Sequence, residues 1–91
     1  MLRVVPFQIS IGLFTTSVPV DFVPLAAGWL RGRPMMWGQY EHPEDADAPQ
    51  EMHRSFSVVY DGDPVLVGME YIDSLYSHDG AQMLHLYGDP L

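Results

Sequence analysis

Alternation of side chains along the first residues is the feature that most restricts how this chain can fold. Residues 3–11 place Val5, Phe7 and Ile9 on one face. The polar Gln8 falls on the other face, and this period of two is typical of a half-buried β-strand. Because no segment keeps a helical period over ten residues, we predict an all-β domain. The alternative is an α+β domain with one short helical turn within residues 19–27.

The rest of the chain divides into short extended segments separated by turn residues. We expect such segments at residues 13–20, 25–30, 35–41, 54–60, 71–76 and 82–87. Gly32 and Asp79-Gly80 supply the residues that tight hairpin turns need. The pattern predicts a single domain over residues 1–91, with about six antiparallel strands in a small barrel or sandwich.

Large apolar side chains on these segments are the expected structural core. Trp29 and Trp37 lie on the two arms of the first hairpin, and we expect them to form a cross-strand aromatic pair. A stacking surface for bases is the alternative, since Arg31 and Arg33 are close in sequence. The full set of predicted core residues is Phe7, Trp29, Trp37, Phe56, Val58, Tyr71, Leu84 and Leu86.

Charge is distributed unevenly along the chain, whose net charge is −8. Residues 1–40 hold three arginines and one aspartate, a net of +2, whereas residues 41–91 hold one arginine and eleven acids, a net of −10. Phosphate backbones and anionic membranes would repel such a domain, so we expect neither nucleic acid nor membrane as a direct partner. A basic protein, including one that itself binds nucleic acid, is the complementary partner. Solubility alone is the simpler explanation of the charge.

The stretch EHPEDADAPQE at residues 41–51 contains five carboxylates and no lysine or arginine. We interpret residues 42–53 as an acidic connecting loop between two strands. His42 and the carboxylates are possible ligands of a divalent cation, but the stretch lacks the glycine and spacing of a calcium loop. We therefore predict no metal site and no cofactor, and expect the acids to contact a partner. The predicted partner-binding residues are Glu41, Glu44, Asp45, Asp47, Glu51, Arg31 and Arg33.

Residues suited to catalysis do not form a recognisable motif. Ser77, His78 and Asp79 are consecutive at a predicted hairpin tip, where three neighbours cannot converge on one another. The chain contains no cysteine. Asp61 and Asp63 are explained by turn chemistry, and His85 by packing within a strand. We predict no catalytic residues and no enzymatic activity.

Four segments occur in a familiar order: MWGQYEHP at residues 36–43, RSFSVV at 54–59, EYID at 70–73 and GAQMLHLY at 80–87. In this order they resemble a family of small bacteriophage proteins of unknown function. The resemblance covers residues 25–88. It implies a phage accessory protein that acts in the cytoplasm of a bacterial host, and it brings no catalytic residues.

Three functions remain open at this point. The first is a non-enzymatic protein-binding module that binds and inhibits a bacterial host protein through its acidic surface, in host takeover or anti-defence. The second is a small structural or assembly module of a phage particle or homo-oligomer. The third is a metal-binding or small-ligand-binding domain.

Overall fold

The fold is all-β, as the alternating pattern predicts. The computed structural model describes residues 1–45 and 47–90. Its strands are β1 (Leu2–Gln8), β2 (Gly12–Pro19), β3 (Val23–Leu30), β4 (Arg33–Glu41), β5 (Glu51–Tyr60), β6 (Glu70–Tyr76) and β7 (Met83–Gly88). In these residues there is no helix that could span a membrane.

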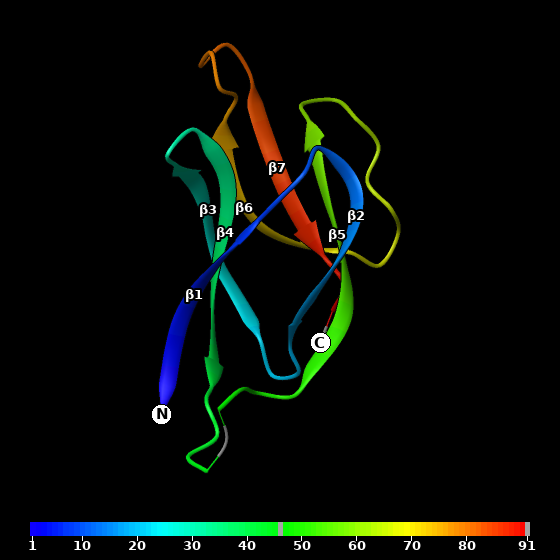
Figure 1. Cartoon of the computed structure of the whole chain (residues 1–91). Helices are drawn as coiled ribbons and strands as arrows, with labels where there is room; N and C mark the ends of the chain where they lie inside the picture. The colour runs from blue at the N-terminus through cyan, green and yellow to red at the C-terminus, as the bar shows by residue number, and fades with distance from the viewer. Residues whose placement is uncertain (46, 91) are drawn as a thin grey trace.

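The strands form two antiparallel sheets (Figure 1). Sheet A has the order β1-β4-β3, and sheet B has the order β2-β5-β7-β6. β1 crosses the molecule diagonally and continues into β2, so the chain changes sheet between these two strands (Figure 1). The sheets do not close into a barrel, and the architecture is an open sandwich.

Residues 19–27 contain no helical turn, so the α+β alternative is wrong. Phe22 N–H donates to the carbonyl oxygen of Pro19 at 2.9 Å, which closes a tight turn. β3 begins immediately afterwards at Val23. Proline at 19 and at 24 leaves the backbone short of the donors that a helix needs here.

The core lies between the inner faces of the two sheets. Phe56, Val58, Leu84 and Leu86 are buried there, which confirms four of the predicted core residues. Phe7 is half-buried and meets the ring of Phe22 edge to face, with centroids 5.2 Å apart. The buried apolar residues are Ile9, Val18, Phe22, Met36, Phe56, Val58, Leu75, Leu84 and Leu86.

The core predictions for Trp29 and Tyr71 are wrong, because these side chains are 37% and 56% exposed. Trp29 is opposite Pro34 in the register and Trp37 is opposite Ala26, so the two tryptophans do not form a cross-strand pair. Trp37 is half-buried on the outer face of sheet A, since its neighbours in β4 occupy the inner face.

The edges of the two sheets meet along β3 and β6. Asp73 accepts a hydrogen bond from Ala27 N–H at 2.8 Å, and Trp29 Nε1 donates to the carbonyl oxygen of Tyr76 at 2.8 Å. These contacts run from side chain to backbone. They hold this side of the sandwich together without a shared strand ladder, because β3 and β6 belong to different sheets.

Candidate functional site

The acidic residues around the β4–β5 connection gather at one end of the sandwich. We call this set the acidic end; its members are Asp21, Glu41, Glu44, Asp45, Asp47 and Glu51. The connection itself is shorter than predicted, covering residues 42–50 rather than 42–53. Glu51 and His53 already belong to β5, where they are opposite Pro19 and Ser17 of β2.

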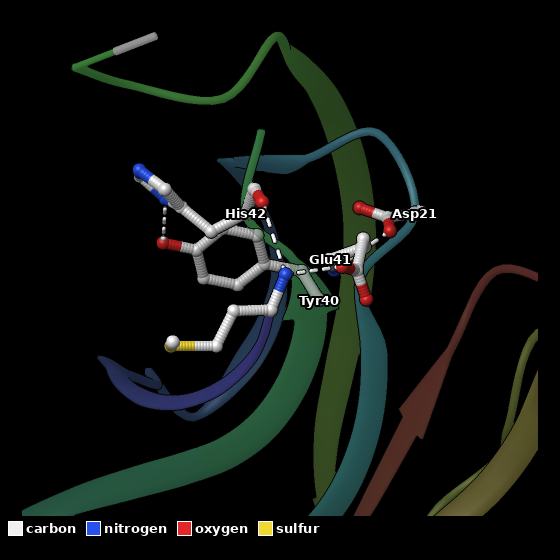
Figure 2. Close-up of polar contacts among 5 residues, drawn as sticks. Asp21, Tyr40, Glu41 and His42 are labelled. Carbon is white, nitrogen blue, oxygen red and sulfur yellow. Dashed lines mark hydrogen bonds and ion pairs between the residues drawn. The ribbon is translucent and has the colours of Figure 1, made fainter. Parts of the chain in front are cut away.

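The turn between β2 and β3 anchors the acidic end to both strands that border it. Asp21 accepts a hydrogen bond from the backbone N–H of Glu41 at 2.8 Å (Figure 2). Val20 N–H donates to the carbonyl oxygen of Gln50 at 3.0 Å. The beginning and the end of the acidic connection are therefore held by one turn.

The amine of Met1 contributes positive charge next to Glu41. It pairs with the Glu41 carboxylate and donates to the carbonyl oxygen of His42 at 3.3 Å (Figure 2). His42 N–H in turn donates to the carbonyl oxygen of Met1 at 2.9 Å. The charge of Glu41 is therefore partly neutralised by the Met1 amine.

His42 is oriented by the side chain that precedes it by two residues. The Tyr40 hydroxyl and His42 Nδ1 are 3.1 Å apart, and the rings meet edge to face with centroids 5.8 Å apart (Figure 2). Tyr40 is buried, so this contact fixes the imidazole at the point where the chain leaves β4. From there Pro43 carries the connection away from the sheet.

Four predicted partner-binding acids remain exposed beyond this anchor. Glu44, Asp45 and Asp47 are exposed on the connection, and Glu51 accepts a hydrogen bond from Ser17 Oγ at 2.7 Å. Within residues 1–45 and 47–90, no three His, Asp or Glu side chains converge in the manner of metal ligands. The hydrogen bonds at both ends of the connection hold these carboxylates at one end of the sandwich, where they can contact a partner.

Two open clefts lie on the acidic end and share Pro43. The first, of about 480 Å³, is polar and includes Arg3, His42, Glu44 and Asp47 in its lining. The second, of about 570 Å³, is mainly apolar and is lined by Val20, Asp21, Glu41, Pro43, Ala48, Pro49 and Gln50. An apolar cleft with carboxylates among its lining residues suits a side chain with an aliphatic stem and a cationic head.

The structure does not bring Arg31 and Arg33 to this site. Arg31 and Gly32 form the turn between β3 and β4, with φ of 51° and 75°. The nine residues of β4 separate this turn from the acidic end, a span of ~30 Å at ~3.3 Å per residue. The predicted partner-binding residues thus occupy two opposite ends of the sandwich (Figure 1).

Sequence reasoning missed a chain of polar contacts on the outer face of sheet B. His85 Nε2 contacts the carboxylate of Asp61, and His85 Nδ1 is 2.7 Å from Ser74 Oγ. The Tyr71 hydroxyl is 2.5 Å from the same Ser74 oxygen. Ser74 is opposite His85 in the β6–β7 register, so counting outward from the hairpin turn could have found the pair.

Ser74, His85 and Asp61 form a chain of serine, histidine and aspartate contacts, but the two imidazole nitrogens have exchanged the places they take in a serine protease triad. Ser74 Oγ is engaged by both His85 and Tyr71, and its contact is with Nδ1 of the imidazole. The chain of contacts joins β6, β7 and the end of β5. It can hold these strands together and orient the imidazole, which agrees with the packing role expected of His85.

Arg54 is a second residue whose role the sequence did not indicate. It is buried, and it lines a cleft of about 170 Å³ together with Glu70 and Asp89. Burial lowers the pKa of Arg54 from its ordinary value, while the charges of Asp89 and Glu70 act in the opposite direction. The guanidinium donates to backbone carbonyl oxygens and therefore has a structural role.

Two packed antiparallel sheets with an acidic end define this chain as a small β-sandwich protein. Residues 3–90 match the sequence profile of the family described as "Domain of unknown function (DUF7352)", and the chain belongs to that family. No curated protein and no solved structure shows significant similarity to it. The expected relationship to a family of unknown function is confirmed at this level.

Proposed function

We propose that this protein is a non-enzymatic protein-binding module that binds a bacterial host protein through its acidic end. The observation that carries the proposal is the anchored connection, which holds Glu44, Asp45 and Asp47 exposed at one end of the sandwich. The resemblance to small phage proteins supports a phage accessory that acts in the bacterial cytoplasm. Binding would inhibit the host protein, in host takeover or anti-defence.

Electrostatics determine the kind of partner that fits. A net charge of −10 over residues 41–91 attracts a basic surface and accelerates its association at low ionic strength. The apolar cleft beside Pro43 can take the stem of a lysine or arginine from that surface, because Asp21 and Glu41 lie among its lining residues. The partner is therefore a basic protein, and its site can be one that binds nucleic acid.

Affinity purification from a bacterial host tests the proposal. The wild type is compared with a loop variant that carries Glu44→Gln, Asp45→Asn and Asp47→Asn. We expect the wild type to retain a basic host protein that elutes with rising salt, and the loop variant to lose it.

A control variant with the same net charge separates local recognition from overall charge. Asp61→Asn, Asp63→Asn and Glu70→Gln remove three acids away from the acidic end, and asparagine keeps the oxygen that His85 and Tyr60 N–H contact. We expect this variant to retain the partner. Equal retention by the loop variant, or failure of the wild type to retain any basic protein, would contradict the proposal.

A further inference from the structure

The outer face of sheet A carries several exposed apolar side chains, and no strand of residues 1–45 and 47–90 packs on it. Its residues alternate with those that face the core, and Leu2 and Val4 of β1 are 61% and 60% exposed. Leu30 and Val23 at the two ends of β3 are also exposed. The face is formed mainly by Leu2, Val4, Pro6, Leu30, Met35 and Trp37. A contiguous exposed apolar patch on a small domain marks an interaction surface.

Trp37 lies at the centre of this face. Its ring extends over Gly28 of the neighbouring strand, where a Cβ built on the glycine would be 3.5 Å from Trp37 Cζ3. The glycine and the small Ala26 opposite Trp37 leave the indole accessible at the middle of the sheet. Accessible indole rings are frequent anchors of protein interfaces.

Charges are placed symmetrically about Trp37 along β4. The side chains that point outward are Arg33, Met35, Trp37, Gln39 and Glu41. Arg33 precedes Trp37 by four residues, and Glu41 follows it by four. The row is therefore cationic at one end and aromatic in the middle, and at the other end it carries the carboxylate of Glu41, which the Met1 amine partly neutralises.

Such a row of side chains is complementary to the same row of a second copy, if the second row runs in the opposite direction. A two-fold axis that lies between two facing sheets and runs across the strands reverses the direction of β4 in the second copy. Each Trp37 then meets the other, and each Arg33 meets a Glu41. β1 faces β1 and β3 faces β3, so apolar residues of these strands meet as well.

We propose that the outer face of sheet A binds a second copy of this chain, with the two β4 strands antiparallel and Arg33 of each copy against Glu41 of the other. This inference goes beyond binding of a host protein. Glu41 is available for the contact, because its side chain is 58% exposed and meets the Met1 amine through Oε1.

The size of the face sets the strength of the association. Three strands at ~4.8 Å spacing and ~30 Å length present a surface of roughly 400 Å². A stable interface buries ~800 Å² per partner. The net charge of −8 on each copy also opposes association. The dimer is therefore reversible and depends on protein concentration.

Sedimentation velocity over a range from low micromolar to millimolar protein tests the arrangement. We expect the wild type to shift from monomer to dimer. Arg33→Glu and Glu41→Arg each place two pairs of like charges in the dimer, and each should raise its Kd about tenfold or more. Circular dichroism checks that both variants remain folded.

Mixing the two variants gives a sharper result. An Arg33→Glu copy and a Glu41→Arg copy form two opposite-charge pairs in the mixed dimer, so the mixture should regain the wild-type Kd. The chain has no cysteine, and Val67 is fully exposed on the β5–β6 connection, so a dye on Val67→Cys can follow the mixed species. A monomeric wild type at millimolar concentration, unaffected single variants, or a mixture that stays monomeric would each overturn the proposal.

Discussion

Arg54 of sheet B donates a hydrogen bond to the carbonyl oxygen of Phe22, next to sheet A, at 2.8 Å. The same guanidinium donates to the carbonyl oxygen of Asp89 at 2.7 Å and lies over the ring of Phe56, 5.4 Å from its centroid. One buried side chain, 4% exposed, thus joins β5 to the turn before β3 and to the segment after β7. Its planar, forked donors are what allow it to reach two carbonyl groups at once.

Replacement of Arg54 by methionine should destabilise the fold strongly. Methionine is of similar length but has no donor, so the carbonyl oxygens of Phe22 and Asp89 lose their partner in a buried setting. We expect a loss of about 2–4 kcal/mol in the free energy of unfolding. Urea unfolding measures it as a lower midpoint at unchanged m-value.

Arg54→Lys is the matched control, because it keeps the charge but cannot reach both carbonyl groups with one planar fork. The free energy of unfolding of Arg54→Lys should lie between that of the wild type and that of Arg54→Met. A loss below about 0.5 kcal/mol for Arg54→Met, the range of ordinary surface substitutions, would show that the arginine does not join the sheets.

Gly38 should tolerate no side chain, since it lies under the ring of Phe22. A Cβ there would overlap that ring and would be 2.7 Å from the carbonyl oxygen of Val23. Phe22 is fully buried and packs against Phe7, so it has little room to move. Gly38→Ala should cost about 2–3 kcal/mol by overpacking, measured by thermal or urea unfolding.

Gly28→Ala provides the comparison on the adjacent strand. Its Cβ would be at 3.5 Å from Trp37 Cζ3, an ordinary contact. We expect its free energy of unfolding to stay within about 0.5 kcal/mol of the wild type. Equal effects of the two substitutions would contradict the packing argument.

Strand β4, which contains Gly38, shows how far the sequence predicts the fold. Period-two alternation in β4 separates Met36, Gly38 and Tyr40 from Met35, Trp37 and Gln39, but both sets contain apolar residues. Periodicity alone cannot tell which set faces the core. Because tryptophan is bulky and apolar, the sequence predicts that the face with Trp37 is buried. The structure buries the face with Gly38 instead, because Phe22 fills the space above this glycine. The error for Trp29 has a different cause: the residue is opposite Pro34, on the face that packs on sheet B, but it is at the end of β3, where its indole reaches the edge of β6 and stays 37% exposed.

The acidic connection and the long-range polar contacts differ in the sequence separation of the residues that they bring together. The acidic connection is contiguous in sequence, so its position between two strands could be predicted. Arg54 meets Phe22, which precedes it by 32 residues, and His85 meets Asp61, which precedes it by 24. Such contacts depend on which strands pair and on how the sheets stack. The local sequence pattern specifies neither the pairing nor the stacking.

Asp73 should be the main polar support of the junction between β3 and β6. Its carboxylate accepts a hydrogen bond from Ala27 N–H at 2.8 Å and one from Ser74 N–H at 2.8 Å. Asp73→Ala leaves the Ala27 donor without its partner, and we expect a loss of about 1–2 kcal/mol. Hydrogen exchange of the Ala27 amide should accelerate in the variant.

Asp73→Asn is the control for this junction, because its amide oxygen can still accept from Ala27 N–H. It should retain more of the protection than alanine does. If the Ala27 amide exchanges at the wild-type rate in Asp73→Ala, the side chain does not hold the two sheet edges together.

Trp29 Nε1 supplies a second support for the same junction by donating to the carbonyl oxygen of Tyr76 at 2.8 Å. Trp29→Phe keeps an aromatic ring near His78 and removes only the donor. We expect a loss of about 1 kcal/mol, as for one partly exposed hydrogen bond. Unfolding of the wild type, both single variants and the Trp29→Phe/Asp73→Ala double variant should give a non-additive cycle. Strict additivity would mean that the two contacts act independently.

Asp79 makes the β6–β7 turn sensitive to acid. Its carboxylate accepts hydrogen bonds from Ser77 Oγ at 2.6 Å and from Ala81 N–H at 2.9 Å. The Ser77 hydroxyl is the largest cause of a pKa for Asp79 below its ordinary value, followed by the Ala81 amide. A pKa lower in the folded than in the unfolded state means that the charged form stabilises the turn.

The contribution of Asp79 is therefore present above its unfolded-state pKa and is lost as the pH falls through its folded-state pKa. NMR titration of the Asp79 carboxyl group and the Ala81 amide should follow this transition together. In Ser77→Ala the pKa of Asp79 should rise toward its ordinary value, because the hydroxyl donor is removed. In Asp79→Asn the pH-dependent change in the chemical shift of the Ala81 amide should be absent. A pKa of Asp79 that is unchanged in Ser77→Ala would show that the hydroxyl does not stabilise the carboxylate.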